Sequence, residues 1–134
     1  MPTAFDLIDS ENIAQAIFIL SSLLGIESGN KGKEAELQKE EGLAAKSQKT
    51  TIKTTEIAIY SILLSVLSYL IFLKVAVLRK NQVLQEIQAG NSNESIRPNM
   101  IIIISFIFSI IGTLLRLKVA NQKLEEAQLP ISLL

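Results

Sequence analysis

Two long apolar runs constrain this chain more than any other feature. Residues 57–73 and residues 99–115 are each 17 consecutive residues without a charge. Each run approaches the roughly 20 residues that a helix needs to cross a hydrocarbon core of about 30 Å. Neither has a polar face, and a helix that is apolar all round is buried in a large core or in lipid. A chain of 134 residues cannot build such a core around both helices, so we predict that both cross a membrane.

A third apolar run is shorter and its role stays open at the level of sequence. Residues 13–26 are 14 residues that include Gln15, a length found in re-entrant, interfacial and short spanning segments. Asp6, Asp9 and Glu11 precede the run without any Lys or Arg, the reverse of the basic start of a secretory signal. The run is therefore either a third span or a helix that lies at the interface or packs on protein.

Composition removes most catalytic chemistry. The chain has no His, no Cys and no Trp, and its 13 Lys and Arg balance 13 Asp and Glu. Thiolate and imidazole chemistry, disulfides and a net positive field for nucleic acid are all absent. Thr3 and Asp6 have the spacing of a helix-capping pair, which explains the early acids better than a metal site does. We expect no enzyme activity, catalytic residue, cofactor, metal, nucleic acid or small-molecule substrate.

Turn-forming residues divide the chain into an all-α order. Gly29 and Gly32 predict a helix break, Gly90 a helix end, Pro98 a first helical turn and Pro130 a stop. The expected order is an N-terminal apolar helix (1–28), a charged helical linker (29–53), a first transmembrane helix with a polar extension (54–89), a loop (90–98), a second transmembrane helix with a polar extension (99–128) and a tail (129–134).

The two long runs also resemble each other as sequences. Placing residues 57–76 over residues 101–120 gives nine identities in twenty positions, and removing residues 77–80 extends the match. The ordered string Leu-Lys-Val-Ala, then Asn-Gln-x-Leu-x-Glu-x-Gln, carries more weight than the matching Ile and Leu. It predicts an internal duplication. Because consecutive spans cross in opposite senses, the copies would form an inverted pseudo-repeat of transmembrane helices, a duplicated hairpin.

Small residues form one stripe on each predicted span, and we take these stripes as candidate helix-packing seams. Transmembrane helices associate where small side chains let their backbones approach closely. The stripes either pack the hairpin on itself, or at least one faces another subunit, of which a serine-lined pore is a narrower version. The candidate residues are Ala58, Ser61, Ser65 and Ser68 on the first span and Ser105, Ser109 and Gly112 on the second.

Basic residues at the ends of the apolar runs are predicted membrane-interface anchors, because long cationic side chains extend to the headgroups. Arg116 lies deepest and is a candidate for a contact between helices. Counting six basic residues on the side of the linker and C-terminus against four on the loop side favours a cytoplasmic linker and C-terminus. The predicted anchors are Lys74, Arg79, Lys80, Arg116 and Lys118.

No Asp or Glu lies inside either long run, which argues against proton-driven rotors and multidrug antiporters. We therefore expect a non-enzymatic, multi-pass protein of a bacterial inner membrane or of a virion's internal membrane. Its expected role is that of a structural or assembly subunit, and its expected partners are the lipid bilayer, further copies of itself or a larger membrane complex. The alternative is a holin-like or effector-like homo-oligomer that permeabilises a membrane.

Overall fold

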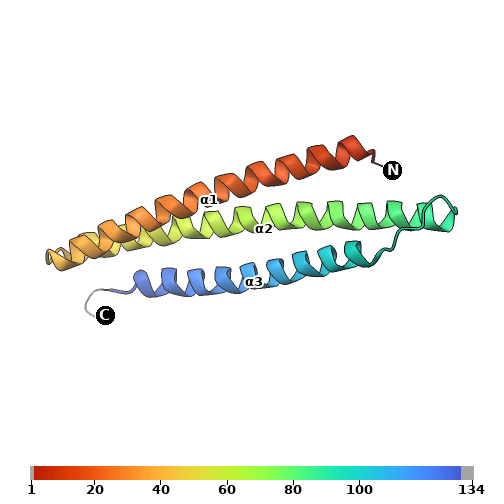
Figure 1. The fold of residues 1–134 in the computed structure, drawn as a ribbon. Helices are drawn as coiled ribbons and strands as arrows, with labels where there is room; N and C mark the ends of the chain where they lie inside the picture. The colour runs from red at the N-terminus through yellow and green to blue at the C-terminus, as the bar shows by residue number, and fades with distance from the viewer. Residues whose placement is uncertain (1, 131–134) are drawn as a thin grey trace.

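The computed structural model describes residues 2–130 as three long helices (Figure 1). They are α1 (Ala4–Glu40), α2 (Ala44–Gln88) and α3 (Arg97–Ala127). Over these residues the structure contains no strand, so the predicted all-α class is confirmed. All three helices are long and apolar enough to cross a membrane, which is compatible with a multi-pass membrane protein.

The helix ends follow from local chemistry. At the start of α1, Thr3 Oγ1 accepts a hydrogen bond from the Asp6 backbone N–H at 3.1 Å, and the Asp6 carboxylate accepts one from the Thr3 N–H at 2.8 Å. This capping box confirms the predicted pair, and its hydrogen bonds lower the pKa of Asp6. Gly42 and Gly90 follow the ends of α1 and α2 with φ of +79° and +76°, a left-handed conformation that favours glycine. Pro98 lies in the first turn of α3.

The break expected at Gly29 and Gly32 is wrong, because α1 runs through both residues to Glu40. The chain turns instead at residues 41–43. Glycine inside a helix costs about 0.5–1 kcal/mol relative to alanine, but α1 packs along α2 at this point. A Cβ at Gly32 would lie 3.8 Å from Thr54 of α2. The pairing of the two helices therefore overrides the weak helix propensity, and residues 29–53 form no separate linker helix.

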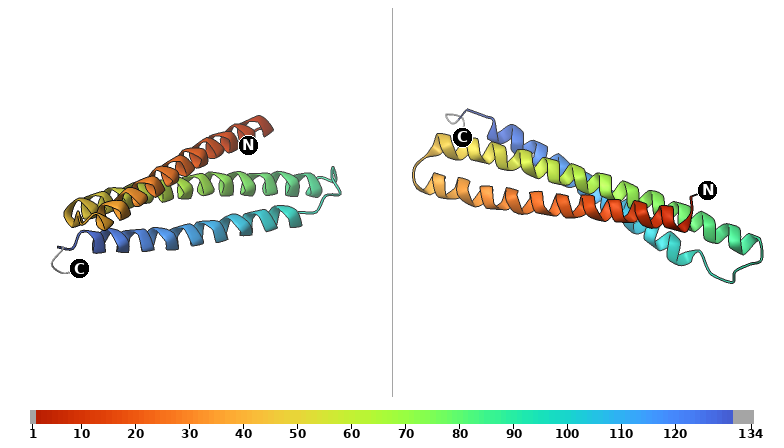
Figure 2. Two further views of the ribbon diagram at one scale, coloured as in Figure 1. Left: turned by 60° about the vertical axis from the view of Figure 1, so that its left-hand side comes forward. Right: turned by 90° about the horizontal axis from the view of Figure 1, so that it is seen from above.

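The central helix is α2, which packs against both of its neighbours. Helix α1 runs antiparallel to α2, and so does α3, while α1 and α3 do not pack on each other within residues 2–130 (Figure 2). The N-terminus and the loop between α2 and α3 therefore lie at one end, here called the loop end. The turn at residues 41–43 and the end of α3 lie at the other, here called the turn end.

The pairing of the helices brings the three apolar runs to overlapping levels. Ser21, in the middle of the run 13–26, contacts Ser61 and Ser65 in the middle of the run 57–73. On the other side of α2, the rings of Phe72 and Phe106 stack with centroids 5.4 Å apart, so the run 99–115 overlaps the run 57–73 and is shifted toward the loop end. A single apolar band results, and the alignment of residues 13–26 within it is what a third span requires.

Cysteine labelling tests whether α1 crosses the membrane with the other two helices. The chain lacks cysteine, so Asp9→Cys, Glu41→Cys and Ser95→Cys each add one exposed thiol without background labelling. We expect a membrane-impermeant maleimide to label Asp9→Cys and Ser95→Cys from the same face of sealed vesicles, and Glu41→Cys from the other. Labelling of Asp9→Cys and Glu41→Cys from one face would show that α1 does not span.

Candidate functional site

The contact between α1 and α2 is built on a strict seven-residue spacing. Of the six buried residues of α1, five have this spacing: Leu7, Ala14, Ser21, Ser28 and Ala35. The sixth, Gln38, accepts a hydrogen bond from Thr50 of α2 near the turn. A seven-residue repeat keeps one stripe of a helix facing its partner when the two helices coil around each other with a left-handed twist. Four of these five residues are small, so the backbones of α1 and α2 approach closely along this stripe.

Serine hydroxyls bond across this contact directly to main-chain carbonyls. Ser21 Oγ donates to the Ser61 carbonyl at 2.6 Å, and Ser61 Oγ donates to the Ser21 carbonyl at 2.7 Å. Ser21 Oγ and Ser65 Oγ lie 2.6 Å apart. Ser68, which is fully buried, donates to the Ala14 carbonyl at 2.7 Å. Such reciprocal bonds fix the register of two helices within an apolar band, where no water competes for the hydroxyls.

The structure therefore places the predicted small-residue stripe of α2 against α1 and not against α3. Ser61, Ser65 and Ser68 all take part in the bonds to α1. Ala58 instead lines a groove between α2 and α3. The sequence pattern predicted that these seams pack within the hairpin of the two long runs or against another subunit. It did not indicate the N-terminal helix as the partner.

The equivalent stripe of α3 is uncovered. Ser105 and Gly112 are exposed, and no atom lies within 4 Å of the position that a Cβ would take at Gly112. Ser109 is half-buried, and its hydroxyl donates within the helix to the Ser105 carbonyl at 3.0 Å. The side of α3 that faces α2 buries Ile103, Thr113 and Ala120 instead.

Beyond the apolar band, the contact between α1 and α2 continues as a polar hairpin (residues 27–56) at the turn end. Ser28 Oγ donates to the Thr54 carbonyl at 3.0 Å, and Ser47 Oγ donates to the Ala35 carbonyl at 2.8 Å. The Gln48 side-chain amide donates to the Ala127 carbonyl at 2.9 Å, which ties the end of α3 to the hairpin. The sequence predicted a charged helical linker in this region, and the structure shows the end of α1 paired with the start of α2.

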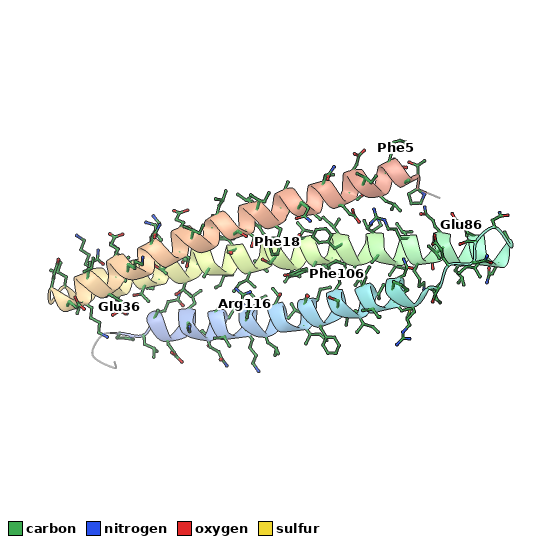
Figure 3. The ribbon with its side chains drawn as sticks, in the orientation of Figure 1. Phe5, Phe18, Glu36, Glu86, Phe106 and Arg116 are labelled. Carbon is green, nitrogen blue, oxygen red and sulfur yellow. The ribbon has the colours of Figure 1, made fainter. Side chains whose placement is uncertain are left out.

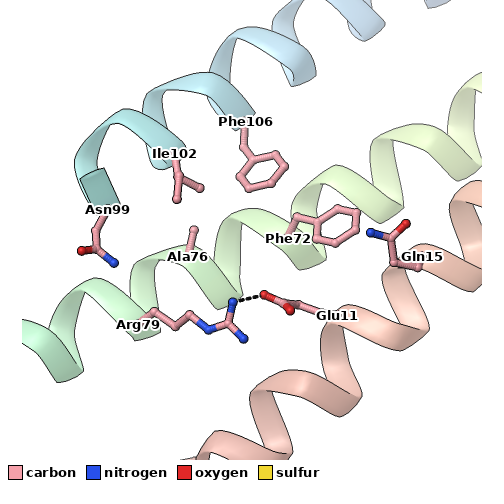
Figure 4. A pocket seen from close by; sticks show the side chains of 8 residues that line it. All are labelled: Glu11, Gln15, Phe72, Ala76, Arg79, Asn99, Ile102 and Phe106. Carbon is pink, nitrogen blue, oxygen red and sulfur yellow. Dashed lines mark hydrogen bonds and ion pairs between the residues drawn. The ribbon is translucent and has the colours of Figure 1, made fainter. Parts of the chain in front are cut away.

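At the loop end, side chains from all three helices line a hollow of about 260 Å³ (Figure 4). Arg79 of α2 forms an ion pair with Glu11 of α1 on one wall. Gln15 and Asn99 add polar groups from α1 and α3, and Phe72 forms part of the apolar wall. Both members of the ion pair remain about one-third exposed, at 39% and 31%, so solvent screens their attraction. The carboxylate of Glu11 therefore neutralises the charge of Arg79 in this hollow.

Aromatic rings connect the two sides of α2 near the same level. Phe18 of α1 meets Tyr69 of α2 edge to face with centroids 5.6 Å apart. Tyr69 also lies 6.5 Å from Phe106 of α3. Figure 3 shows Phe18 between α1 and α2 and Phe106 between α2 and α3. Aromatic pairs at these distances add specific packing, so this cluster orients the outer helices on α2.

The predicted interface anchors have different surroundings. Lys74 and Lys118 are exposed and Lys80 is half-buried, while Arg79 belongs to the ion pair with Glu11. Arg116 is exposed on α3 and lines the groove beside α2.

Within residues 2–130, no group of three or more Asp or Glu side chains is placed to hold a metal ion. Comparison of the chain with protein families, curated proteins and solved structures finds no match. The geometry of the described residues supports association between helices, through small residues, hydroxyl groups and aromatic rings.

Two features were missed at the level of sequence. The spacing of Ala14, Ser21, Ser28 and Ala35 is a readable signal, but dividing the chain at Gly29 hid it. The pairing of Glu11 with Arg79 joins residues that are 68 positions apart, and no local pattern indicates it.

Substitutions at Ser68 test the close approach of α1 and α2. We expect Ser68→Leu to lower the free energy of unfolding by about 1–3 kcal/mol, because a larger side chain forces the backbones apart. Ser68→Ala should cost about 0.6 kcal/mol, a typical value for one hydrogen bond between membrane helices. Unfolding in mixed micelles, followed by circular dichroism, measures both.

Ser22→Leu is the matched control, because Ser22 is exposed on α1 and its hydroxyl bonds only to the Phe18 carbonyl of the same helix. Its replacement should change stability by less than about 0.5 kcal/mol. If Ser68→Leu is no worse than Ser22→Leu, the close contact between α1 and α2 does not carry the stability described here.

Proposed function

We propose that this protein is a non-enzymatic, multi-pass membrane protein that acts as a structural or assembly subunit. It associates with further copies of itself, or with a larger membrane complex, through the small-residue face of α3. The observation that carries the proposal is the stripe of Ser105, Ser109 and Gly112, in which Ser105 and Gly112 are exposed and Ser109 is half-buried. In a lipid environment, such a stripe is a surface on which another helix packs closely.

The internal duplication strengthens this interpretation. We infer that α2 and α3 carry copies of one ancestral segment in inverted orientation, which aligns Ser61 with Ser105 and Ser65 with Ser109. On α2 these serines bond to Ser21 of α1. On α3 their counterparts have no such helix within residues 2–130. A small-residue helix from a second copy, of the kind that α1 provides, fits the vacant position.

The use of the α2 serines favours a structural role over a serine-lined pore. Ser61, Ser65 and Ser68 already bond to main-chain carbonyls or hydroxyls of α1. A pore lined by these groups would require α1 to leave α2 and would break those bonds in an apolar medium. The permeabilising alternative therefore has fewer polar groups available than the sequence suggested.

We propose that the turn end faces the cytoplasm, or the interior of a virion. With α1 as a third span, four basic residues, Lys74, Arg79, Lys80 and Arg97, lie at the loop end. The other nine of the 13 lie at the turn end. An excess of Lys and Arg in short segments beside the spans favours retention on the cytoplasmic side. A bacterial inner membrane or the internal membrane of a virion fits this small multi-pass design.

Self-association through α3 is testable in mild detergent. We expect the wild-type protein to form a defined oligomer by light scattering, or to co-purify with a stoichiometric partner. Ser105→Leu/Gly112→Leu should shift it toward the monomer, because the bulk prevents close helix contact. Ile104→Phe/Ile111→Phe adds bulk at other exposed positions of α3 and should leave the oligomer intact.

A monodisperse wild-type monomer without a partner would contradict the proposal, as would an oligomer that the Ser105→Leu/Gly112→Leu variant retains. Vesicles that contain the inserted protein should hold an entrapped dye. Leakage that rises with protein density would instead support the permeabilising alternative.

A further inference from the structure

A second groove lies between α2 and α3 at the turn end, with a volume of about 510 Å³. The apolar residues that line it, here called its floor, include Ala58 and Ile62 of α2 and the exposed Leu115 of α3. Its rim carries Arg116 and Lys123, which lie seven residues apart and therefore on the same face of α3. Figure 3 shows Arg116 on α3, beside α2. The groove thus combines an apolar floor with a cationic rim.

The charge of this groove is uncompensated by its own walls. No Asp or Glu is among the residues that line it, although Glu27 and Glu56 belong to the same end of the structure. Within residues 2–130, neither Arg116 nor Lys123 forms an ion pair, whereas Arg79 at the loop end pairs with Glu11. Two cations on one face of α3, without an acid among the residues that line the groove, favour a bound anion between them.

The depth of the groove identifies the kind of anion. Arg116 directly follows the uncharged run 99–115, while Ala58 and Ile62 across the groove belong to the uncharged run 57–73. The groove therefore begins within the apolar band, and the long Arg116 side chain extends from there toward the headgroups. The apolar floor extends from there toward the middle of the band. Thr54 also lines the groove, and its buried Oγ1 has no hydrogen-bond partner in the described part of the chain.

We propose that this groove binds one anionic phospholipid. The headgroup phosphate lies between Arg116 and Lys123, and an acyl chain lies along Ala58, Ile62 and Leu115. Charge complementarity selects an anionic over a zwitterionic lipid, and the apolar floor selects a lipid over free phosphate. The site requires membrane insertion but not self-association through α3, so it does not depend on the structural role proposed above.

Native mass spectrometry of the full-length protein in mild detergent tests the site. The protein is mixed with phosphatidylglycerol and phosphatidylcholine of the same acyl chains. We expect preferential retention of one phosphatidylglycerol. Removing both cations with Arg116→Gln/Lys123→Gln should weaken retention about tenfold or more, because each basic group near the headgroups contributes substantially to binding anionic lipid.

Lys53→Gln/Lys118→Gln is the matched control. It removes the same charge at the same end from two exposed residues outside the groove, and it should change retention less than about twofold. An equal loss in both double variants would overturn the proposal, because it would show diffuse attraction instead of a built site. All variants should keep the helical circular dichroism of the wild type.

Ala58→Phe tests the apolar floor while keeping both cations. Retention of phosphatidylglycerol should fall, whereas unchanged retention, or displacement of the lipid by millimolar inorganic phosphate, would overturn the assignment to a lipid. Repeating the titration with Ser105→Leu/Gly112→Leu separates the two proposals. Retention in that variant supports a site within one chain whatever its oligomeric state, and loss of retention there overturns it.

Discussion

The close approach of α1 to α2 is the interaction on which the rest of the structure depends. Between helices in lipid there is no hydrophobic gain from association, so packing and hydrogen bonds decide the pairing. Ser21 and Ser61 each donate to the other's main-chain carbonyl, which is possible only where both side chains are short. This contact fixes the register. The register in turn brings the apolar runs 13–26 and 57–73 to one level and places Glu11 beside Arg79.

Because α2 is the shared partner of α1 and α3, the two ends of the structure differ in charge. At the loop end, α1 contributes Glu11 to the hollow and neutralises Arg79. At the turn end, the groove between α2 and α3 receives no acid from α1, which contributes only Ser28. The hollow therefore contains a paired cation, while the groove contains two cations that form no ion pair within residues 2–130.

Helix α3 is the least enclosed of the three, since within residues 2–130 it buries only Ile103, Thr113 and Ala120, fewer residues than α1 or α2 buries. Its uncovered stripe corresponds in sequence to the stripe that α1 covers on α2. Under the proposed duplication, one ancestral segment has two environments in the same chain, and the difference lies in the neighbouring helix. Such an arrangement suits a subunit that completes its packing with lipid and with other chains.

Much of the architecture follows from the sequence by itself. Several local signals each act within a single helix or its first turn. They are the uncharged runs 57–73 and 99–115, the capping pair Thr3 and Asp6, and Pro98. They predicted an all-helical membrane protein and the start of α1. The small residues of α2 were also recognised as a packing surface, because their spacing is a property of a single helix.

The tertiary structure decided which surfaces meet. The sequence could not show that Ser61, Ser65 and Ser68 pack on α1, that Gly32 lies within a continuous helix, or that Arg79 has an acidic partner. Each of these outcomes depends on the register between helices far apart in the chain, where a contact with α2 outweighs local propensity. The sequence by itself determined which segments are apolar helices, and the packing determined which face of each helix contacts a neighbour and which stays exposed.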